Sequence, residues 1–385
     1  MNENQHICDN LSDVTEPDRG SAAMHQICIP ANRAKQLGRT SYHANTDTLW
    51  CSHSASGIAF GFRGRTCTLR LIADSAYQTA ACAARYAVYL NETLIADALL
   101  TEPERILTIQ HPNDENVIAW VRLVKLSESA MSALGIQGIR IAVSQAVRQQ
   151  YQENVFVPAA DHCRRIEFIG DSITCGYGID GQCGEMFRTS TENAEKSYAY
   201  LTAAQLNADY SMVCCSGYGI ISGYTADGIA DTLHLVPPLY RQIGHCVAVI
   251  EDSRTIDDDL WDFAVRSDLV VINLGTNDAS YTGDDAEKQA DFAKAYRTFL
   301  HTVRRRNPDV PILCTLGTMG QTLCSAVELA VSGYSAENGD DRIRTMRFDM
   351  QDEADGMAVD WHPSALTHEK AAAKLCREIH AWLGW

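Results

Sequence analysis

A serine lies where a buried-type strand pattern gives way to a helix start. Gly170-Asp171-Ser172 directly follows the apolar run Ile166–Ile169. A hydroxyl at a helix N-terminus has free N–H groups behind it, and these stabilise negative charge that develops on an attacked carbonyl oxygen. Ser172 is therefore a candidate nucleophile, although a lone G-D-S pattern is more often a turn whose serine only caps the helix.

Two further segments carry hydrogen-bond donors. Ser216-Gly217-Tyr218-Gly219 follows the apolar run Tyr210–Cys215, and a glycine such as Gly217 lets a backbone N–H approach a ligand closely. Gly275-Thr276-Asn277-Asp278 follows Leu269–Leu274, and the Asn277 amide can donate to an oxyanion. Taken singly, such a glycine is also common in turns, and Asn277 fits an Asx turn equally well.

A histidine completes the set in Asp360-Trp361-His362-Pro363-Ser364, just before the last helical pattern. A histidine on a loop at a sheet edge can act as general base toward a serine. His362 is one of 12 histidines in the chain, so a surface or capping role is the alternative. No C-x-x-C pair or H-E-x-x-H motif is present, so the sequence gives a zinc site little support.

In chain order, Ser172, Gly217, Asn277 and His362 resemble the four blocks of the SGNH hydrolase superfamily. The resemblance implies that Ser172 is both the nucleophile and a backbone oxyanion donor. It also implies that Gly217 gives the second backbone donor, that Asn277 gives the side-chain donor and that His362 is the base.

The chain also looks like carbohydrate esterase family 2, with Gly38-Arg39-Thr40 near the start and the D-W-H-P-S segment near the end. Members remove acetyl groups from plant polysaccharides and oligosaccharides, and pair a jelly-roll domain with an SGNH domain. The resemblance implies a serine esterase whose partner is an acetylated oligosaccharide or polysaccharide such as acetylated xylan, with no metal and no cofactor. Trp361 and Tyr218 flank the expected site, where their rings either stack on a sugar or pack as its wall.

The last block departs from the superfamily pattern D-x-x-H. Val359 stands three residues before His362, and the nearest acid, Asp360, stands only two before it. On an extended segment, a shift of one residue turns a side chain to the opposite face. We therefore expect a Ser172–His362 dyad, its ring oriented by a main-chain carbonyl, ahead of a triad in which Asp360 is the acid.

Two other functions remain open from the sequence. One is a short-chain esterase, lipase or thioesterase of the same superfamily. The other is a glycan-binding protein whose hydrolase domain is degenerate. The sequence defines neither the sugar, nor the O-acetyl position, nor the oligomeric state.

The elements that must position these residues fall into two patterns. Period-2 alternation from Gly38 to about Val143, in six to eight short strands, predicts a β-sandwich, a jelly roll by resemblance. From residue 165 onward, strands alternate with helices, which predicts an α/β/α domain around a parallel five-stranded sheet, flavodoxin-like by resemblance. The expected division is a flexible tail (1–25), the sandwich (26–148), a linker (149–164) and the hydrolase domain (165–385).

Two helices have clear boundaries in the sequence. One begins near Ala286 and ends at the three arginines before Asn307 and Pro308, because cations and a proline stop are typical of helix C-termini. The other runs from about Leu366 to Leu383, with Ser364 as its cap. The acidic run 257–259 is predicted to be a solvated surface.

Composition limits the class of protein. The 385 residues, at about 150 per domain, predict two domains. A net charge of −17 argues against nucleic-acid and anionic-membrane partners, which need cations to neutralise phosphates. The N-terminus lacks the basic and apolar stretches of a secretory signal, so we expect a cytoplasmic protein unless a leader was removed. The 14 scattered cysteines are expected to be reduced thiols in the core.

Overall fold

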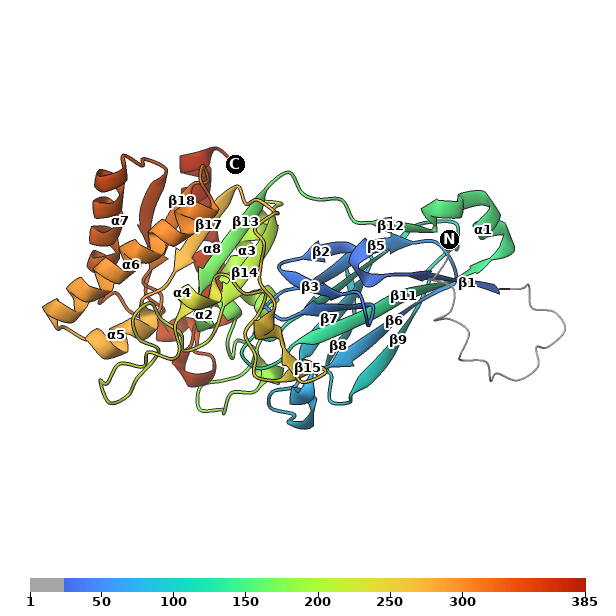
Figure 1. Ribbon diagram of the computed structural model, residues 1–385, viewed down its shortest axis with the longest axis horizontal. Coiled ribbons are helices and arrows are strands. Elements are labelled where there is room, and N and C mark those ends of the chain that lie inside the picture. Colours follow the sequence, from blue (N-terminus) through green and yellow to red (C-terminus); the bar gives the residue numbers. More distant parts are fainter. Residues whose placement is uncertain (1–23) are drawn as a thin grey trace.

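The computed structural model describes residues 24–385, which form two domains side by side (Figure 1). Most of the predicted tail, residues 1–23, lies outside the described residues. The remaining two residues of that range, Met24 and His25, belong to strand β1, which pairs with β11. None of the helices in the described part of the chain is long and apolar enough to cross a membrane.

The first domain is a sandwich of two antiparallel sheets, so the predicted fold class is confirmed. Its described residues form twelve strands, more than the six to eight expected, because several are only three or four residues long. One sheet contains β1 Met24–Ile29, β3 Thr40–His43, β4 Thr48–Cys51, β6 Thr66–Ala73, β9 Glu104–Gln110 and β11 Leu134–Ser144. The other contains β2 Lys35–Leu37, β5 Gly57–Phe62, β7 Arg85–Leu90, β8 Thr93–Leu99, β10 Ala119–Lys125 and β12 Phe156–Pro158.

Alternating side chains of both sheets build the sandwich core. Leu69 and Ile141 from one sheet, and Phe60 and Leu123 from the other, are completely buried in one cluster. Burying an aliphatic or aromatic side chain contributes about 1.5–3 kcal/mol each, so the period-2 pattern of the sequence is the main source of this domain's stability.

The predicted linker, 149–164, differs from the structure. Its first part belongs to helix α1 Gln145–Tyr151, and β12 pairs with β5 at the edge of the second sheet. Pro158 ends that edge strand, where a proline is tolerated because no partner needs its missing N–H. The connection between the domains is therefore confined to residues 159–164.

The second domain is built on a parallel five-stranded sheet, as predicted. Its strands are β13 Arg165–Gly170, β14 Asp209–Cys214, β17 Leu269–Asn273, β18 Ile312–Leu316 and β19 Ile343–Arg347. Their spatial order, β14-β13-β17-β18-β19, is that of a flavodoxin-like fold. The same hydrophobic runs that predict buried strands are completely buried here, for example Ile272 and Cys314 on one face and Phe168 and Leu313 on the other.

Helices cover both faces of this sheet (Figure 1). α6 Ala286–Arg306 and α7 Cys324–Asn338 pack together on one face, and α3 Tyr198–Gln205 and α8 Ala365–Leu383 on the other. The predicted caps are confirmed, since Asn307 ends α6 and the Ser364 hydroxyl accepts from the Thr367 N–H. Shorter helices are α2 Ser172–Cys175, α4 Val236–Leu239 and α5 Thr276–Thr282.

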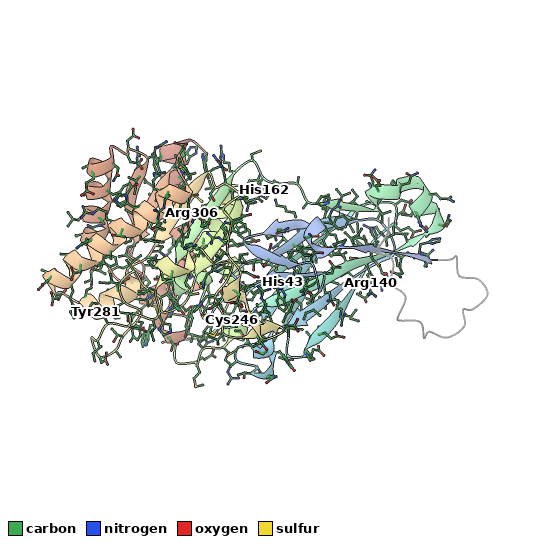
Figure 2. The ribbon with its side chains drawn as sticks, in the orientation of Figure 1. His43, Arg140, His162, Cys246, Tyr281 and Arg306 are labelled. Carbon is green, nitrogen blue, oxygen red and sulfur yellow. The ribbon has the colours of Figure 1, made fainter. Side chains whose placement is uncertain are left out.

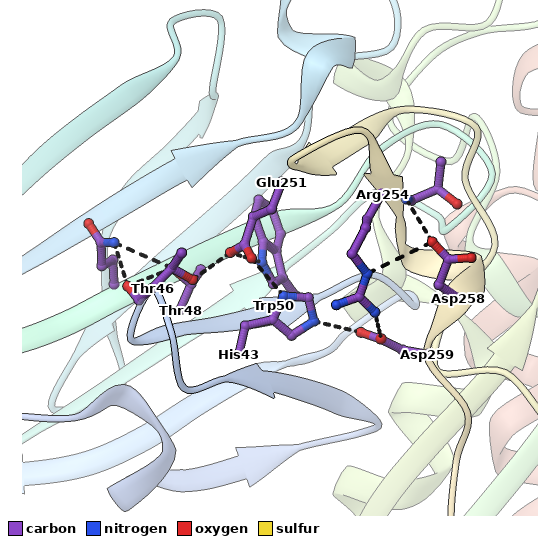
Figure 3. A network of polar contacts seen from close by, with 10 residues as sticks. His43, Thr46, Thr48, Trp50, Glu251, Arg254, Asp258 and Asp259 are labelled. Carbon is purple, nitrogen blue, oxygen red and sulfur yellow. Dashed lines mark hydrogen bonds and ion pairs between the residues drawn. The ribbon is translucent and has the colours of Figure 1, made fainter.

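A segment between α4 and β17 of the second domain packs against the first domain. It contains the small hairpin β15 Val249–Glu251 and β16 Arg254–Thr255, and its apolar side chains pack on Trp50 of the first domain. His43 of the first domain lies in the middle of the molecule (Figure 2). Its Nδ1 lies 2.9 Å from Glu251 Oε2, and its Nε2 lies 2.7 Å from Asp259 Oδ2 (Figure 3).

The prediction that residues 257–259 form a solvated surface is therefore wrong for Asp259, whose side chain is only 11% exposed. Asp259 contacts His43 of the first domain, whereas Asp257 accepts from the Cys246 N–H at 2.7 Å within its own segment. Several cysteines, among them Cys67, Cys214 and Cys314, are free thiols buried in the cores, as expected. The expectation is wrong for Cys163 and Cys183, which are exposed.

Candidate active site

Loops at the carboxyl edge of the parallel sheet carry the residues singled out in the sequence. Ser172 follows β13, Gly217 follows β14 and Asn277 follows β17, while His362 lies between β19 and α8. Because parallel strands end at one edge, these chain-distant loops meet there, as ligand sites of open α/β sheets do.

Ser172 is the first residue of α2 and is nearly buried. Asp171 caps this helix, its carboxylate accepting from the Ile173 N–H at 3.1 Å. The turn needs glycine at position 170, because a Cβ there would lie 2.0 Å from Thr174 Oγ1. As the first residue of the helix, Ser172 has an N–H without an intrahelical acceptor.

His362 lies within hydrogen-bond distance of the serine. Its Nε2 is 2.8 Å from Ser172 Oγ. Its Nδ1 faces two main-chain carbonyls, Val359 O at 3.1 Å and Asp360 O at 3.2 Å. A carbonyl only accepts, so Nδ1 carries the proton and Nε2 is left to accept from the serine hydroxyl.

The Asp360 carboxylate does not reach the His362 ring, which corrects the alternative of a triad with Asp360. Tyr177 OH donates to this carboxylate at 2.7 Å. The reason differs from the one-residue register shift expected for an extended segment. Residues 359–361 form a 3-10 turn in which Asp360 and Trp361 both have left-handed backbones, with φ of 51° and 61°.

Burial lowers the pKa of His362 below its ordinary value of 6.5, and the carbonyls of Val359 and Asp360 offset this only in part. A neutral imidazole at physiological pH is the form that can take a proton from a hydroxyl. The electrostatic setting of His362 is therefore that of a base.

Gly217 is at the third position of a turn from Cys215 to Tyr218, with φ of +81°. This conformation favours glycine, because a side chain there would be strained. A Cβ at Gly217 would meet no described heavy atom within 4 Å, so the turn faces open space.

The Asn277 amide lies between two of the other loops. Its Nδ2 donates to Tyr218 O at 2.8 Å and is 3.4 Å from Asp171 Oδ2. One amide hydrogen thus anchors the side chain to the Gly217 turn. The contact with Asp171 is long for a hydrogen bond, which leaves the second hydrogen for a substrate oxygen.

Two buried carboxylates support these loops. Asp278 accepts from the backbone N–H groups of Ile220, Ile221 and Ser222 at 2.7–3.1 Å. Burial raises the pKa of Asp278 to about 6 and that of Asp171 to about 7. Each carboxylate binds backbone donors next to the site, and Asp278 in particular holds the segment that follows the Gly217 turn.

Tyr177 is a site residue that the sequence analysis missed. Its ring stacks on Phe187, with centroids 3.9 Å apart, and lies 4.3 Å from the His362 ring. The Tyr177 ring therefore packs against the imidazole, while its hydroxyl donates to the Asp360 carboxylate. Tyr177 follows the serine block by five residues, but no spacing rule links that position to Asp360.

The two aromatic candidates differ in their surroundings. Trp361 is 62% exposed next to His362, so its ring is available to a ligand. Tyr218 is only 6% exposed, and its ring contacts those of His234 and His245 edge to face. Of the two alternatives left open for Tyr218, packing in the wall of the site is the one that this geometry favours.

One group of side chains in the described residues has the spacing of metal ligands. Candidate ligand atoms of Glu128, Cys175 and Glu192 all lie within 4.8 Å of one another, and all three residues are completely buried. Cys175 lies on the serine helix α2, and Glu128 also accepts from the Ser216 N–H in the loop after β14.

The model of the GDSL-like lipase/acylhydrolase family matches residues 168–370, more than half of the chain. The chain belongs to this family. The match spans all four predicted blocks of the GDSL-like domain, from the serine loop to the histidine loop.

The predicted resemblance to family 2 carbohydrate esterases is confirmed by two curated relatives and by a solved structure. Cellulase/esterase CelE of Acetivibrio thermocellus is 38% identical over 229 residues, 58% of this chain and 26% of that protein. An acetylxylan esterase/glucomannan deacetylase of Cellvibrio japonicus is 28% identical over 225 residues, 58% of each chain. The GDSL-like chain thus spans less than two thirds of either curated relative.

A solved structure covers both domains. A family two carbohydrate esterase from Clostridium thermocellum, in complex with cellohexaose, is similar with a TM-score of 0.75 and 26% sequence identity. The similarity covers 91% of this chain and 99% of that one. The combination of an antiparallel sandwich with a GDSL-like domain is therefore shared with a carbohydrate esterase.

Proposed function

We propose that this protein is a serine esterase that removes O-acetyl groups from carbohydrate, such as acetylated xylo-oligosaccharide. The observation that carries the proposal is the 2.8 Å separation of Ser172 Oγ and His362 Nε2 at the open edge of the sheet. The substrate class is supported by the names of the relatives, an acetylxylan esterase and a carbohydrate esterase among them.

The proposed reaction has two acyl-transfer steps. His362 Nε2 takes the Ser172 hydroxyl proton as Oγ attacks the acetyl carbonyl. The N–H groups of Ser172 and Gly217 and the amide of Asn277 bind the resulting oxyanion. The imidazolium then protonates the sugar oxygen as the C–O bond breaks, which leaves an acetyl-serine.

Deacylation repeats the cycle with water. His362 takes a proton from water as its oxygen attacks the acetyl-serine, and returns that proton to Oγ when acetate leaves. With carbonyls instead of a carboxylate at Nδ1, the imidazolium formed in each step is less stabilised than in a triad. Tight placement of the oxyanion donors is correspondingly more important.

The test is acetate release from acetylated xylo-oligosaccharide by the full chain and by Ser172→Ala. We expect release by the wild type and, with no nucleophile to form the acyl-enzyme, a loss of about 10⁴-fold or more in the variant. A pre-steady-state burst with p-nitrophenyl acetate that persists in Ser172→Ala would place the nucleophile elsewhere.

The same assay separates the other functions. Faster hydrolysis of octanoyl than of acetyl esters would favour a lipase-type substrate. Binding of the oligosaccharide without acetate release would favour a glycan-binding protein with an inactive hydrolase domain. The hydrogen-bonded Ser172–His362 pair supports the catalytic alternative over this last one.

A further inference from the structure

A buried polar cluster beneath the candidate site contains residues from both domains. Lys125 and Glu128 belong to the first domain, at and just after the end of β10, whereas Cys175 lies on α2 and Glu192 on a loop before α3. All four residues are completely buried. A carboxylate is kept in such a place only when its contacts offset the cost of desolvation.

One oxygen of Glu128 contacts both the turn that contains Gly217 and the helix that begins at Ser172. Oε2 accepts from the Ser216 N–H at 2.7 Å and lies 3.5 Å from Cys175 Sγ. Ser216 immediately precedes Gly217, and Cys175 is one helical turn after Ser172. The Glu128 carboxylate therefore ties the turn of the predicted oxyanion donor to the helix that carries the nucleophile.

Glu128 is itself held rigidly. Its N–H donates to Glu192 Oε2 at 2.8 Å, and the Lys125 ammonium donates to the carbonyls of Ser127 and Glu128 at 2.6 and 2.9 Å. Leu126 O accepts from the Ala194 N–H at 3.0 Å. The loop 125–128 is thus bonded on both sides, so the Oε2 position is well defined relative to the second domain.

The charges favour this positioning role over a metal site. Oε1 of Glu128 and Oε1 of Glu192 are buried without a hydrogen-bond partner. Burial raises the pKa of both carboxyls, and for Glu192 the nearby Glu128 adds to the effect. A raised pKa favours the protonated carboxyl, which does not coordinate a metal ion, and the positive charge of the buried Lys125 nearby also disfavours a cation here.

We propose that Glu128 is a positioning residue of the esterase site, through which the first domain sets the orientation of the Gly217 N–H toward Ser172. The inference rests on the proposed function, because it assigns Gly217 the role of an oxyanion donor. It means that the sandwich completes the active site of the second domain.

The test uses the full chain and p-nitrophenyl acetate, whose turnover does not depend on sugar recognition. Glu128→Ala should lower kcat about 10- to 100-fold, the scale expected for a misplaced donor, with KM changed less than about twofold. Glu128→Gln should recover most of kcat, because the amide oxygen still accepts from the Ser216 N–H. Affinity for a boronic acid, which forms a tetrahedral adduct with a serine, should fall in Glu128→Ala by the same factor as kcat.

Glu195→Ala is the matched control. Glu195 makes another contact between the domains, with Arg122 and Tyr89, but has no bond to the Gly217 turn. If Glu195→Ala lowers kcat as much as Glu128→Ala, general loosening of the interface explains the effect and the proposal is overturned. Unchanged boronate affinity in Glu128→Ala would also overturn it.

Circular dichroism shows whether Glu128→Ala folds. If it does not, Glu128→Asp decides, because its carboxylate is one methylene too short for Ser216; equal kcat in Glu128→Asp and Glu128→Gln contradicts the proposal. A wild type that hydrolyses p-nitrophenyl acetate but releases no acetate from the oligosaccharide would refute the proposed substrate class, while these variants still judge Glu128.

Discussion

His362, the proposed base, is oriented without a carboxylate. Its Nδ1 proton points at two backbone carbonyls, and burial keeps the ring neutral. The Asp360 side chain, turned away by a left-handed backbone, binds Tyr177 instead. The imidazole is therefore held by the fold of the 359–361 turn rather than by an ion pair.

Because the Asp360 side chain does not contact His362, Asp360→Asn should change kcat less than about threefold. Loss of the acid of a catalytic triad lowers kcat about 10⁴-fold. In the wild type and in Asp360→Asn, kcat/KM should begin to fall only below pH 6.5. The reason is that the pKa of His362 is lowered below 6.5, so the imidazole is protonated only at a lower pH. The measurement is a pH profile with p-nitrophenyl acetate. Tyr177→Phe, which removes only the hydrogen bond to Asp360, is the control; a loss of 100-fold or more in Asp360→Asn alone would restore the triad.

At the scale of elements, the site depends on loops held by single buried side chains. Asp278, on α5, is the clearest case, since its carboxylate is the acceptor for three successive N–H groups after the Gly217 turn. A buried donor left without a partner costs about 1–3 kcal/mol.

Asp278→Ala should therefore lower the free energy of unfolding by about 3 kcal/mol or more, because three such donors lose their acceptor. Asp278→Asn keeps one acceptor oxygen, so its free energy of unfolding should lie between those of the wild type and Asp278→Ala. Urea unfolding followed by tryptophan fluorescence measures both. Asp284→Ala, an exposed position close by, should be neutral; a loss in Asp278→Ala of no more than about 0.5 kcal/mol, the surface level, would argue that the loop does not need this carboxylate.

These elements also show how far the sequence could go. The β13 and β17 strands and the ends of α6 were predictable, because apolar runs, a terminal arginine cluster and a proline are local signals. Strand β12 was not, since Phe156–Pro158 is three residues long and ends in proline. The turn at Asp360 and Trp361 was not predictable either, because a left-handed backbone at two successive non-glycine residues is uncommon and has no local signal in the sequence.

The placement of the site residues follows the same division. Ser172, Gly217, Asn277 and His362 could be found because each lies in a short motif next to a recognisable strand or helix. Glu128 could not, since Ser127-Glu128-Ser129 is unremarkable in the sequence and gains its contacts only when a loop of the first domain meets the second. Long-range contacts of that kind have no local pattern.

At the scale of the whole molecule, His43 connects the domains through two acidic side chains. Its burial lowers its pKa, but the hydrogen bonds to Asp259 and Glu251 raise it overall. A histidine whose pKa is raised by folding stabilises the folded state fully below its unfolded pKa of about 6.5, and this stabilisation is lost as the pH rises through the folded value. Arg254 also donates to Asp259, at 2.7 Å.

His43→Gln should therefore lower the free energy of unfolding by about 2 kcal/mol at pH 5.5, and by less than half as much at pH 8.5. Urea unfolding at the two pH values measures the difference. His111→Gln, at a more exposed histidine of the same domain, is the control and should lower the free energy of unfolding by less than His43→Gln at pH 5.5. An equal loss for His43→Gln at both pH values would mean that the charge of this ring does not contribute.

The connection of only six residues, 159–164, has a consequence for anyone who recombines the two domains with other partners. Fully stretched, it spans about 20 Å, and a tether that short holds each half near the other at an effective concentration in the millimolar range. Weak mutual affinity is then enough to keep the halves docked. A chimaera that grafts either half onto a foreign partner through a longer spacer would dilute that advantage, even with every contacting side chain retained.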